Sequence, residues 1–556
     1  MSTTVSDQTM PQAEPATPAT PTAPVMPAMP GTPGQPVLMY YVPPAPKPKR
    51  VYEVGLVDGL FALITLVVGY LWWDWLLPRS AVYPIPQGEA YIDRLPGVGV
   101  TAFFVLVLAV SMAYYRLKGV RLSPAAIVGA GLILLASIPF ALYATTPLHV
   151  LLGMALVAGF VTWHAVASRT ACSRGLDAGI VIDAVNQWFP APFTNLGAWW
   201  SGFTQLLHKH EKSKQVVIVV VGVFVSLPII IAVVALLMSA DAGFQNLVQE
   251  IGRVIGTINF GRFFWQTIGA VPIALFASAL LYANANRQGT NAATRDGAER
   301  VRRGAQKVPA SALAAPVVIL DVIYVAFFAA MGTYLFSGFA GNLPDGFTYA
   351  DYARRGFFEL AVVAAINGLV IAFCYLFAVR RGAGYSAALR WSGVVLCVMT
   401  LLLIATSVSK MVLYIDAYGL TRLRFFTMAF MIVQAIVFGL VLARHLKVFA
   451  VSRPIIITIL VAFIGLAWAN PEGIIARYDV SRYQTGDLQQ VDIDYLSTLG
   501  DAAIPSIASL TNDYNPVVAQ AARVVLQDRG YENQAPMAWV SWTWQSQSAS
   551  NTTQGR

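Results

Sequence analysis

The sequence predicts an all-α integral membrane protein, in which a bundle of about 11 transmembrane helices is followed by a short helical extracytoplasmic tail. Hydrophobic residues make up 57% of the 556 positions and charged residues only 12%, whereas a soluble domain carries roughly 25% charged residues. Apolar runs of about 20 residues recur along the chain, and this length allows a helix to cross a bilayer. Both observations place the chain in a membrane.

The candidate spans are eleven apolar runs that polar or basic loops separate from one another. The last run is short, so it is the weakest assignment as a full span. The runs cover Leu56–Leu77, Gly97–Tyr115, Pro124–Tyr143, Leu148–Ala167, Val216–Met238, Phe260–Tyr282, Ala314–Phe336, Phe357–Val379, Leu389–Tyr414, Phe425–Ala443 and Pro454–Ala469.

The distribution of basic residues predicts the orientation of the spans. Lys and Arg accumulate in cytoplasmic loops, and the segment before the first span ends in Lys47, Lys49 and Arg50. With a cytoplasmic N-terminus, 23 of the 37 basic residues fall on cytoplasmic segments, and every cytoplasmic loop carries more of them than its external neighbours. We therefore predict a multi-pass protein of the cell membrane with a cytoplasmic N-terminus and an extracytoplasmic C-terminus.

Composition divides the chain into four parts. Residues 1–50 are rich in Pro, Ala and Thr and have too few large apolar residues for a core, which predicts disorder. Residues 51–470 form the transmembrane domain. Residues 471–530 contain short amphipathic patterns and predict a small helical extracytoplasmic segment. Residues 531–556 are polar toward their end and predict a disordered tail.

The composition also limits the partners and cofactors. The lipid bilayer is the first partner, and the basic cytoplasmic loops are expected to contact its anionic headgroups. The net charge of +9 reports orientation, so no nucleic acid is expected. The cysteines and histidines are scattered, and no known catalytic or phosphate-binding motif occurs. We therefore predict no metal, no cofactor and no catalytic residue, and an enzyme is the less favoured class.

Polar residues at the predicted external boundary are the best indication of a ligand site, because they are costly near apolar runs. Ser407, Lys410 and Tyr414 share one helical face in the ninth span, and acids and bases follow it. If the helix ends meet, these groups surround one extracytoplasmic cavity that binds a small molecule or a lipid. The candidate residues are Asp351, Arg354, Glu359, Lys410, Tyr414, Asp416, Tyr418, Arg424, Arg477 and Tyr478.

Structural interpretations compete with this one. Lys410 lies near the interface, where its amine could reach water. Asp351, Arg354 and Glu359 could simply form a solvated start of a helix. Asp321 and Asn367 lie within predicted spans; Asp321 needs either a partner or a proton, so it is a candidate for function or for a bond between helices.

Three motifs resemble a known family. Residues 414–424 fit the pattern Tyr-x-x-x-Tyr-Gly-Leu-Thr-x-x-Arg, and residues 348–360 and 470–478 carry the other two. Together they resemble a bacterial polytopic membrane family, the domain of unknown function numbered four-one-seven-three or a close sibling, over roughly residues 210–530. This chain has Asp479 where the family usually has Asn. The resemblance implies an architecture and a shared external cluster, but no reaction.

Three functions fit these observations. The first is the binding or translocation of an envelope-related ligand at the external cluster, and arginine side chains there favour an anionic ligand. The second is an enzyme that acts on a lipid-linked envelope substrate, in which Asp351, Glu359 or Asp416 supplies acid–base chemistry. The third is a structural or signalling partner that uses the C-terminal tail for docking.

Overall fold

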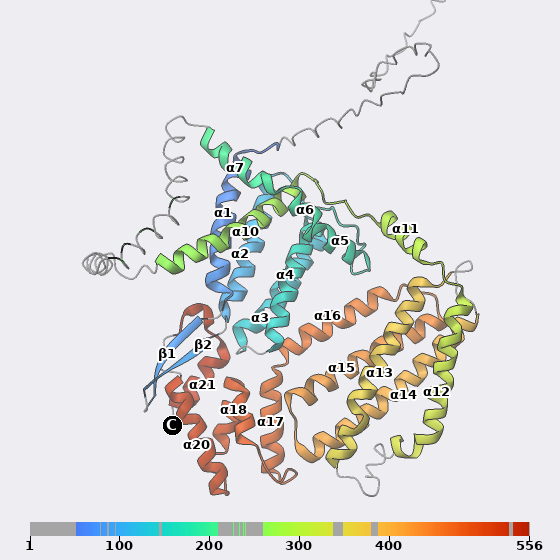
Figure 1. The fold of residues 1–556 in the computed structure, drawn as a ribbon. Helices are drawn as coiled ribbons and strands as arrows, with labels where there is room; N and C mark the ends of the chain where they lie inside the picture. The colour runs from blue at the N-terminus through green and yellow to red at the C-terminus, as the bar shows by residue number, and fades with distance from the viewer. Residues whose placement is uncertain are drawn as a thin grey trace, which may run out of the picture. The chain divides into compact units, whose positions relative to one another are not determined.

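The computed structural model of the chain (Figure 1) describes residues 52–77, 79–85, 88–94, 96–143, 147–208, 260–336, 349–379, 387–532 and 537–554, with four isolated positions between 226 and 240. The chain divides into two units, Met1–Val51 and Tyr52–Arg556. Every element described below belongs to the second unit.

Nine helices of the described part are long and apolar enough to cross a membrane, so the protein is a multi-pass membrane protein. A tenth candidate is α16 (Ser452–Trp468), which joins α17 (Pro471–Gln484) at a bend of 61°. The nine are α1 (Leu56–Trp75), α2 (Val98–Leu117), α3 (Pro124–Leu142), α4 (Pro147–Ala167), α10 (Phe260–Ala285), α12 (Ala310–Phe336), α13 (Tyr349–Phe377), α14 (Ala387–Tyr418) and α15 (Arg422–Leu446).

These helices coincide with ten of the eleven predicted spans. The remaining run, Val216–Met238, falls outside the described residues apart from isolated positions, so the count of eleven stays a prediction. One antiparallel hairpin, β1 (Arg79–Ile85) with β2 (Gly88–Arg94), departs from the all-α prediction. Apolar patterning over span length does not detect such a short hairpin, although Val82, Tyr83, Tyr91 and Ile92 favour extended backbone.

The N-terminal bundle contains α1, α2, α3, α4 and α10 and has an aromatic core. Phe103, Phe104, Tyr114 and Tyr115 are all buried in it. The backbones of α1 and α10 approach closely at Gly69, where a Cβ atom would lie 2.5 Å from the carbonyl oxygen of Ala270. Three short helices pack at one end of this bundle: α5 (Gly179–Trp188), α6 (Pro190–Phe193) and α7 (Leu196–His208).

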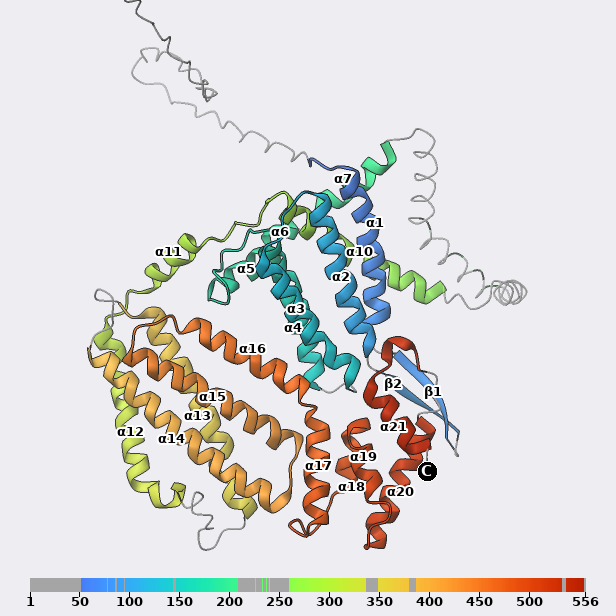
Figure 2. The same ribbon diagram turned by 180° about the vertical axis from the view of Figure 1, so that it is seen from behind.

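The C-terminal bundle contains α12, α13, α14 and α15, which lie side by side in both views (Figure 1, Figure 2). Its core includes Leu396, Leu403 and Met431. Between the two bundles in sequence is α11 (Arg295–Ala305), a short helix with no buried residue.

A small helical domain follows the last apolar helix. It consists of α17, α18 (Ile493–Thr498), η2 (Gly500–Ala502), α19 (Ile504–Ser509), α20 (Pro516–Glu532), η3 (Trp539–Ser541) and α21 (Trp544–Gln554), and we call these elements the C-terminal domain. Its own core contains Ile475, Leu496, Ile507 and Leu510.

The end of the C-terminal domain differs from the disordered tail predicted for residues 531–556. The structure has η3 and α21 there, and Gln545, Ser546 and Ala549 are buried. The hydroxyl group of Ser546 donates to Asp501 at 2.6 Å, so α21 is held by contacts with the rest of the domain. Its polar sequence shows no apolar stripe, and tertiary contacts of this kind cannot be read from composition.

Hydrogen bonds attach the C-terminal domain to the N-terminal bundle. The backbone amides of Gly97 and Val98, at the start of α2, donate to the carbonyl groups of Val540 and Trp542 at 2.8 and 2.9 Å. Beside these bonds, α21 packs against α3, and the hydroxyl group of Tyr143, at the end of α3, donates at 2.9 Å to the carbonyl group of Trp468, the last residue of α16. The domain therefore contacts the end of the bundle where α2 begins and α3 ends.

Candidate functional site

The turn between α14 and α15 is built by the motif residues at its centre. Gly419 has a φ of +75°, which is a left-handed conformation that favours glycine. Thr421 then caps α15, and its hydroxyl oxygen accepts a hydrogen bond from the amide of Arg424 at 3.4 Å. The backbone conformation of the turn thus explains why glycine and threonine occupy positions 419 and 421.

The side chain of Arg424 folds back over this turn. Its guanidinium carbon lies 3.8 Å from the ring centroid of Tyr414, and the rings of Tyr414 and Tyr418 are 5.4 Å apart. Its Nη1 atom donates to the carbonyl oxygens of Tyr418 (3.0 Å) and Gly419. Because arginine supplies both a cation over an aromatic face and donors for the last carbonyl groups of α14, it closes the turn.

The C-terminal domain binds the same turn from the other side. The carboxylate of Asp479, in α17, accepts a hydrogen bond from the amide of Leu420 at 2.6 Å. Arg422 pairs with Glu472 at 3.3 Å and donates to the carbonyl group of Thr498 at 2.7 Å. We call this contact between residues 414–424 and α17–α18 the α14–α17 joint.

A second ion pair extends the α14–α17 joint. Asp416 and Arg482 are 2.7 Å apart, and Arg482 also donates to the hydroxyl group of Tyr478 at 2.9 Å. Five of the predicted candidates therefore lie in the α14–α17 joint, where they contact other groups of the same chain: Tyr414, Asp416, Tyr418, Arg424 and Tyr478.

Burial shapes the electrostatics of the α14–α17 joint outside the membrane spans. Burial raises the pKa of Asp479 to about 6, against the opposing effects of the Leu420 amide, Arg424 and Arg482. Burial also raises the pKa of Glu472, which the Arg422 guanidinium opposes. The Oε2 atom of Glu472 is buried without a hydrogen-bond partner among the described residues.

A polar cavity of about 260 Å³ lies beside the α14–α17 joint, where α17 begins. It reaches from the end of α3, in the membrane bundle, to α17, η2, α19 and α21 of the C-terminal domain, and we call it the domain cavity. Its lining residues are Tyr143, Asn470, Gly473, Arg477, Asp501, Ala502, Pro505, Ser506, Trp544, Gln545 and Ser548.

The lining of the domain cavity carries one guanidinium group, that of Arg477, and one carboxylate, that of Asp501, and most of its polar groups already have partners. Asp501 accepts from Ser546 and lies 3.7 Å from Arg529. Asn470, with a φ of +52°, caps α17 and accepts from the Gly473 amide and from Gln545, each at 3.3 Å. Arg477 differs, because its Nε donates to the Gly473 carbonyl group at 3.1 Å and no described carboxylate pairs with it.

Sequence reasoning found Arg477 but missed Asn470, Asp501, Trp544 and Gln545. The last two lie in the segment that was predicted to be disordered. The capping pattern Asn470-Pro471-Glu472 was a usable signal for the start of a helix. No pattern in residues 544–545 indicated that they would line a cavity.

The remaining candidates lie apart from the domain cavity. Lys410 is only 1% exposed within α14, so its amine does not extend into water. Glu359 is exposed within α13, and the side chains of Asp351 and Arg354 are outside the described set. In the C-terminal bundle, Asn367 accepts from the hydroxyl group of Tyr324 at 2.8 Å and donates to Thr400 at 2.9 Å.

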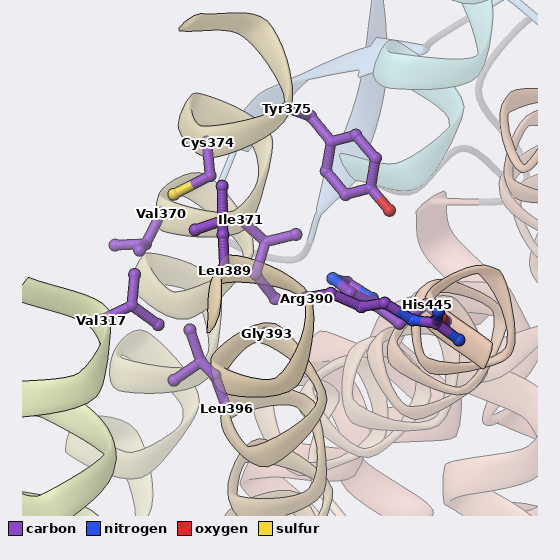
Figure 3. A pocket seen from close by; sticks show the side chains of 10 residues that line it. All are labelled: Val317, Val370, Ile371, Cys374, Tyr375, Leu389, Arg390, Gly393, Leu396 and His445. Atoms are coloured by element: carbon purple, nitrogen blue, oxygen red, sulfur yellow. The ribbon is translucent and has the colours of Figure 1, made fainter. Parts of the chain in front are cut away.

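Asp321 lies one turn before Tyr324 in α12 and is 7% exposed. Its Oδ1 atom has no hydrogen-bond partner within the described part of the chain. A small cavity of about 20 Å³ also lies in this bundle, with Tyr375, Arg390 and His445 on one side and apolar residues on the other (Figure 3). It has room for a single water molecule and contains no predicted site residue.

Among the described residues, no group of three or more His, Cys, Asp or Glu side chains is placed to hold a metal ion. The domain cavity offers hydrogen-bonding groups, the guanidinium group of Arg477, the carboxylate of Asp501, which accepts from Ser546, and the indole ring of Trp544.

The fold and its polar cavity define a polytopic helical membrane protein with a small helical domain beyond its last apolar helix. Residues 102–510 match the family described as domain of unknown function (DUF4153), and because this match covers most of the chain, the chain belongs to that family. The predicted resemblance to a family of unknown function is therefore confirmed. The family is the one numbered 4153, a close sibling in the sense of the prediction, and not four-one-seven-three. Searches of the curated proteins and of the solved structures give no match.

Proposed function

We propose that this protein binds an anionic, envelope-related ligand in the domain cavity, on the extracytoplasmic side of the cell membrane. The observation that carries the proposal is Arg477, which lines a polar cavity of about 260 Å³ without a carboxylate partner among the described residues. Its guanidinium group offers a planar set of donors that suits carboxylate and phosphate groups.

The position of the domain cavity supports this proposal. The start of α17 lines the cavity through Asn470 and Gly473, and a helix N-terminus favours negative charge. Trp544, which is 64% exposed, adds an apolar face to the same cavity. An anionic group on a partly apolar molecule satisfies all three features.

The arginines of the α14–α17 joint support a different role. Arg422, Arg424 and Arg482 each bind groups of the chain itself within the α14–α17 joint. These contacts favour a structural role for the motif, as the attachment of the C-terminal domain, and this is our second candidate function. An enzyme has less support, because the carboxylate of Asp416 is paired with Arg482.

The proposed orientation uses the charge distribution along the chain. The C-terminal domain contacts the start of α2, α3 and the α14–α15 turn, and the charge distribution predicts that the start of α2, the end of α3 and this turn lie outside the cell. On the opposite side, α11 exposes Arg300 and Arg303, and we propose that these residues contact anionic lipid headgroups.

The test of the ligand site is native mass spectrometry of the full-length protein extracted with its own lipids. The wild-type protein should carry a specific bound species, and Arg477→Gln should reduce it about tenfold, because a hydrogen bond to a charged group contributes about 1.5–3 kcal/mol. The mass of the bound species would identify its chemical class.

Arg523→Gln is the matched control for this experiment. Arg523 lies in the same domain, and it also donates to a backbone carbonyl group, that of Thr511, at 2.9 Å. The same change in charge there should leave the bound species in place. A bound species that survives Arg477→Gln, or none in the wild-type protein, would contradict a ligand site in the domain cavity.

A further inference from the structure

The N-terminal bundle contains a second and larger cavity, of about 420 Å³, which is partly open. Residues of four membrane-spanning helices line it, including Trp72 of α1, Phe103 of α2, Phe160 of α4 and Phe276 of α10. Trp188 of the short helix α5 completes the lining. We call it the bundle cavity, and none of the candidate residues predicted from sequence lies in it.

The chemistry of the bundle cavity is almost entirely apolar. Its polar side chains are Thr65, Ser111 and His164, and all three are already engaged. The hydroxyl groups of Thr65 and Ser111 donate to carbonyl groups of their own helices at 3.0 and 2.7 Å. The Nδ1 atom of His164 is 2.7 Å from the Tyr115 hydroxyl oxygen. Water needs two to four polar partners, so this cavity suits an apolar occupant.

We infer that the bundle cavity binds the hydrocarbon chain of a membrane lipid. Protein interiors are close-packed, and a void of this size forfeits the contacts of every side chain around it. The volume lies within the range of ligand pockets that bury a small organic molecule. Because membrane-spanning helices line the cavity, lipid chains are the apolar molecules that surround it in the membrane.

The helix α5 accounts for the polar end of such a lipid. It places Trp188 at the bundle cavity, and Val181 of α5 and Phe189, the residue after it, are exposed by 66% and 62%. An amphipathic helix with exposed aromatic and aliphatic side chains suits the membrane interface. A lipid chain in the cavity would therefore have its headgroup at the level of α5.

The test uses full-length protein that is delipidated in detergent and then incubated with one of two probes. The probes are palmitoyl-oleoyl phosphatidylglycerol and a polyprenyl phosphate, and native mass spectrometry counts the lipids retained. The wild-type protein should retain one molecule of at least one probe. Which probe is retained separates an acyl chain from an isoprenoid chain as the source.

Two substitutions fill the bundle cavity. Ala277→Phe adds a ring from α10, and Ser111→Leu adds a smaller side chain from α2, so the second serves if the first does not fold. Each folded variant should retain at least about tenfold less lipid, since the added atoms occupy the volume of the chain. The control Ala326→Phe adds the same ring at an exposed position of α12 and should retain lipid as the wild-type protein does.

Two results would overturn the inference. One is equal retention of the probe by the wild-type protein and by either folded cavity-filling variant. The other is a wild-type protein that retains neither probe, which would mean that another part of the chain fills the cavity.

Discussion

Arg424 and Arg477 belong to two of the three sequence motifs, and their surroundings differ. Arg424 stacks on Tyr414 and donates to carbonyl groups of its own turn, whereas Arg477 lines a cavity. At the residue scale, part of the predicted polar cluster meets in the structure, including Asp416 and Tyr478 through Arg482, whereas Lys410 and Glu359 lie apart from it. The sequence could not predict whether an arginine would bind its own chain or a ligand, because that depends on contacts between distant elements.

Substitution of Gly419 tests the backbone conformation of the α14–α17 joint. Gly419→Ala should lower the free energy of unfolding by about 2 kcal/mol, because the residue adopts a φ of +75°. A Cβ atom there would also lie 2.7 Å from the Asp479 carboxylate. Thermal unfolding in detergent measures the change.

Gly439→Ala is the control for this substitution. A Cβ atom at Gly439, within α15, would meet no atom within 4 Å, and alanine is the better helix former. This variant should be as stable as the wild-type protein or more so. Equal stability of Gly419→Ala and the wild-type protein would contradict the strained turn.

The raised pKa of Asp479 predicts that the stability of the folded protein depends on pH. The pKa of this residue in the folded protein is about 6, above its usual value of 3.8, so the folded state binds the proton more tightly than the unfolded state. Its contribution to stability is therefore complete below about pH 4 and is lost as the pH rises through 6. The loss should be about 3 kcal/mol at most, since one pKa unit corresponds to 1.36 kcal/mol.

Thermal unfolding between pH 4 and pH 7 should show this loss in the wild-type protein and not in Asp479→Asn. The amide oxygen of asparagine can still accept the hydrogen bond from Leu420, and it carries no charge to bury. Asp494→Asn, at an exposed position of α18, controls for the change in net charge. An unchanged pH profile in Asp479→Asn would mean that other groups cause the dependence.

At the scale of elements, hydropathy identified the apolar helices well, because length and apolar content alone define a membrane span. The same reasoning failed for the hairpin of β1 and β2 and for α21. Residues 544–552 include four Ser or Thr residues and no apolar stripe, so local propensity does not favour a helix there. Contacts with η2 and α19 determine α21, and these contacts exist only in the folded domain.

The attachment of η3 to α2 predicts the effect of a truncation. Removal of residues 537–556 should expose the amides of Gly97 and Val98, which would then lose their acceptors on Val540 and Trp542. Each lost hydrogen bond is worth about 1 kcal/mol. Hydrogen exchange measured by mass spectrometry should be faster at the start of α2.

Removal of residues 553–556 alone is the control for this truncation. It leaves η3 and most of α21 in place, so exchange at the start of α2 should match that of the full-length protein. Equal exchange after the longer truncation would show that η3 does not protect α2.

At the scale of the whole molecule, two exposed positions test the proposed orientation. Tyr514 in the C-terminal domain is 86% exposed, and Val448 between α15 and α16 is 82% exposed. In a Cys172→Ser background, Tyr514→Cys should react with a membrane-impermeant maleimide added to intact cells, and Val448→Cys should react only after lysis. Cys374 and Cys397 are buried.

The labelling experiment has a clear contrary result. Reaction of Val448→Cys in intact cells, with Tyr514→Cys protected, would reverse the orientation and place the domain cavity in the cytoplasm. The charge distribution predicts the first outcome because it depends on all the loops together. The sequence could not identify the domain cavity itself, since its lining comes from five segments between Tyr143 and Ser548.

The central claim is that Arg477 binds a ligand while Arg424 holds the C-terminal domain in place. The most direct test measures thermal stability and the bound species by native mass spectrometry in Arg477→Gln and Arg424→Gln. We predict that Arg477→Gln loses the bound species and keeps its stability, and that Arg424→Gln loses stability while its folded fraction keeps the bound species. The reverse pattern, with the bound species lost only in a stable Arg424→Gln variant, would contradict the account.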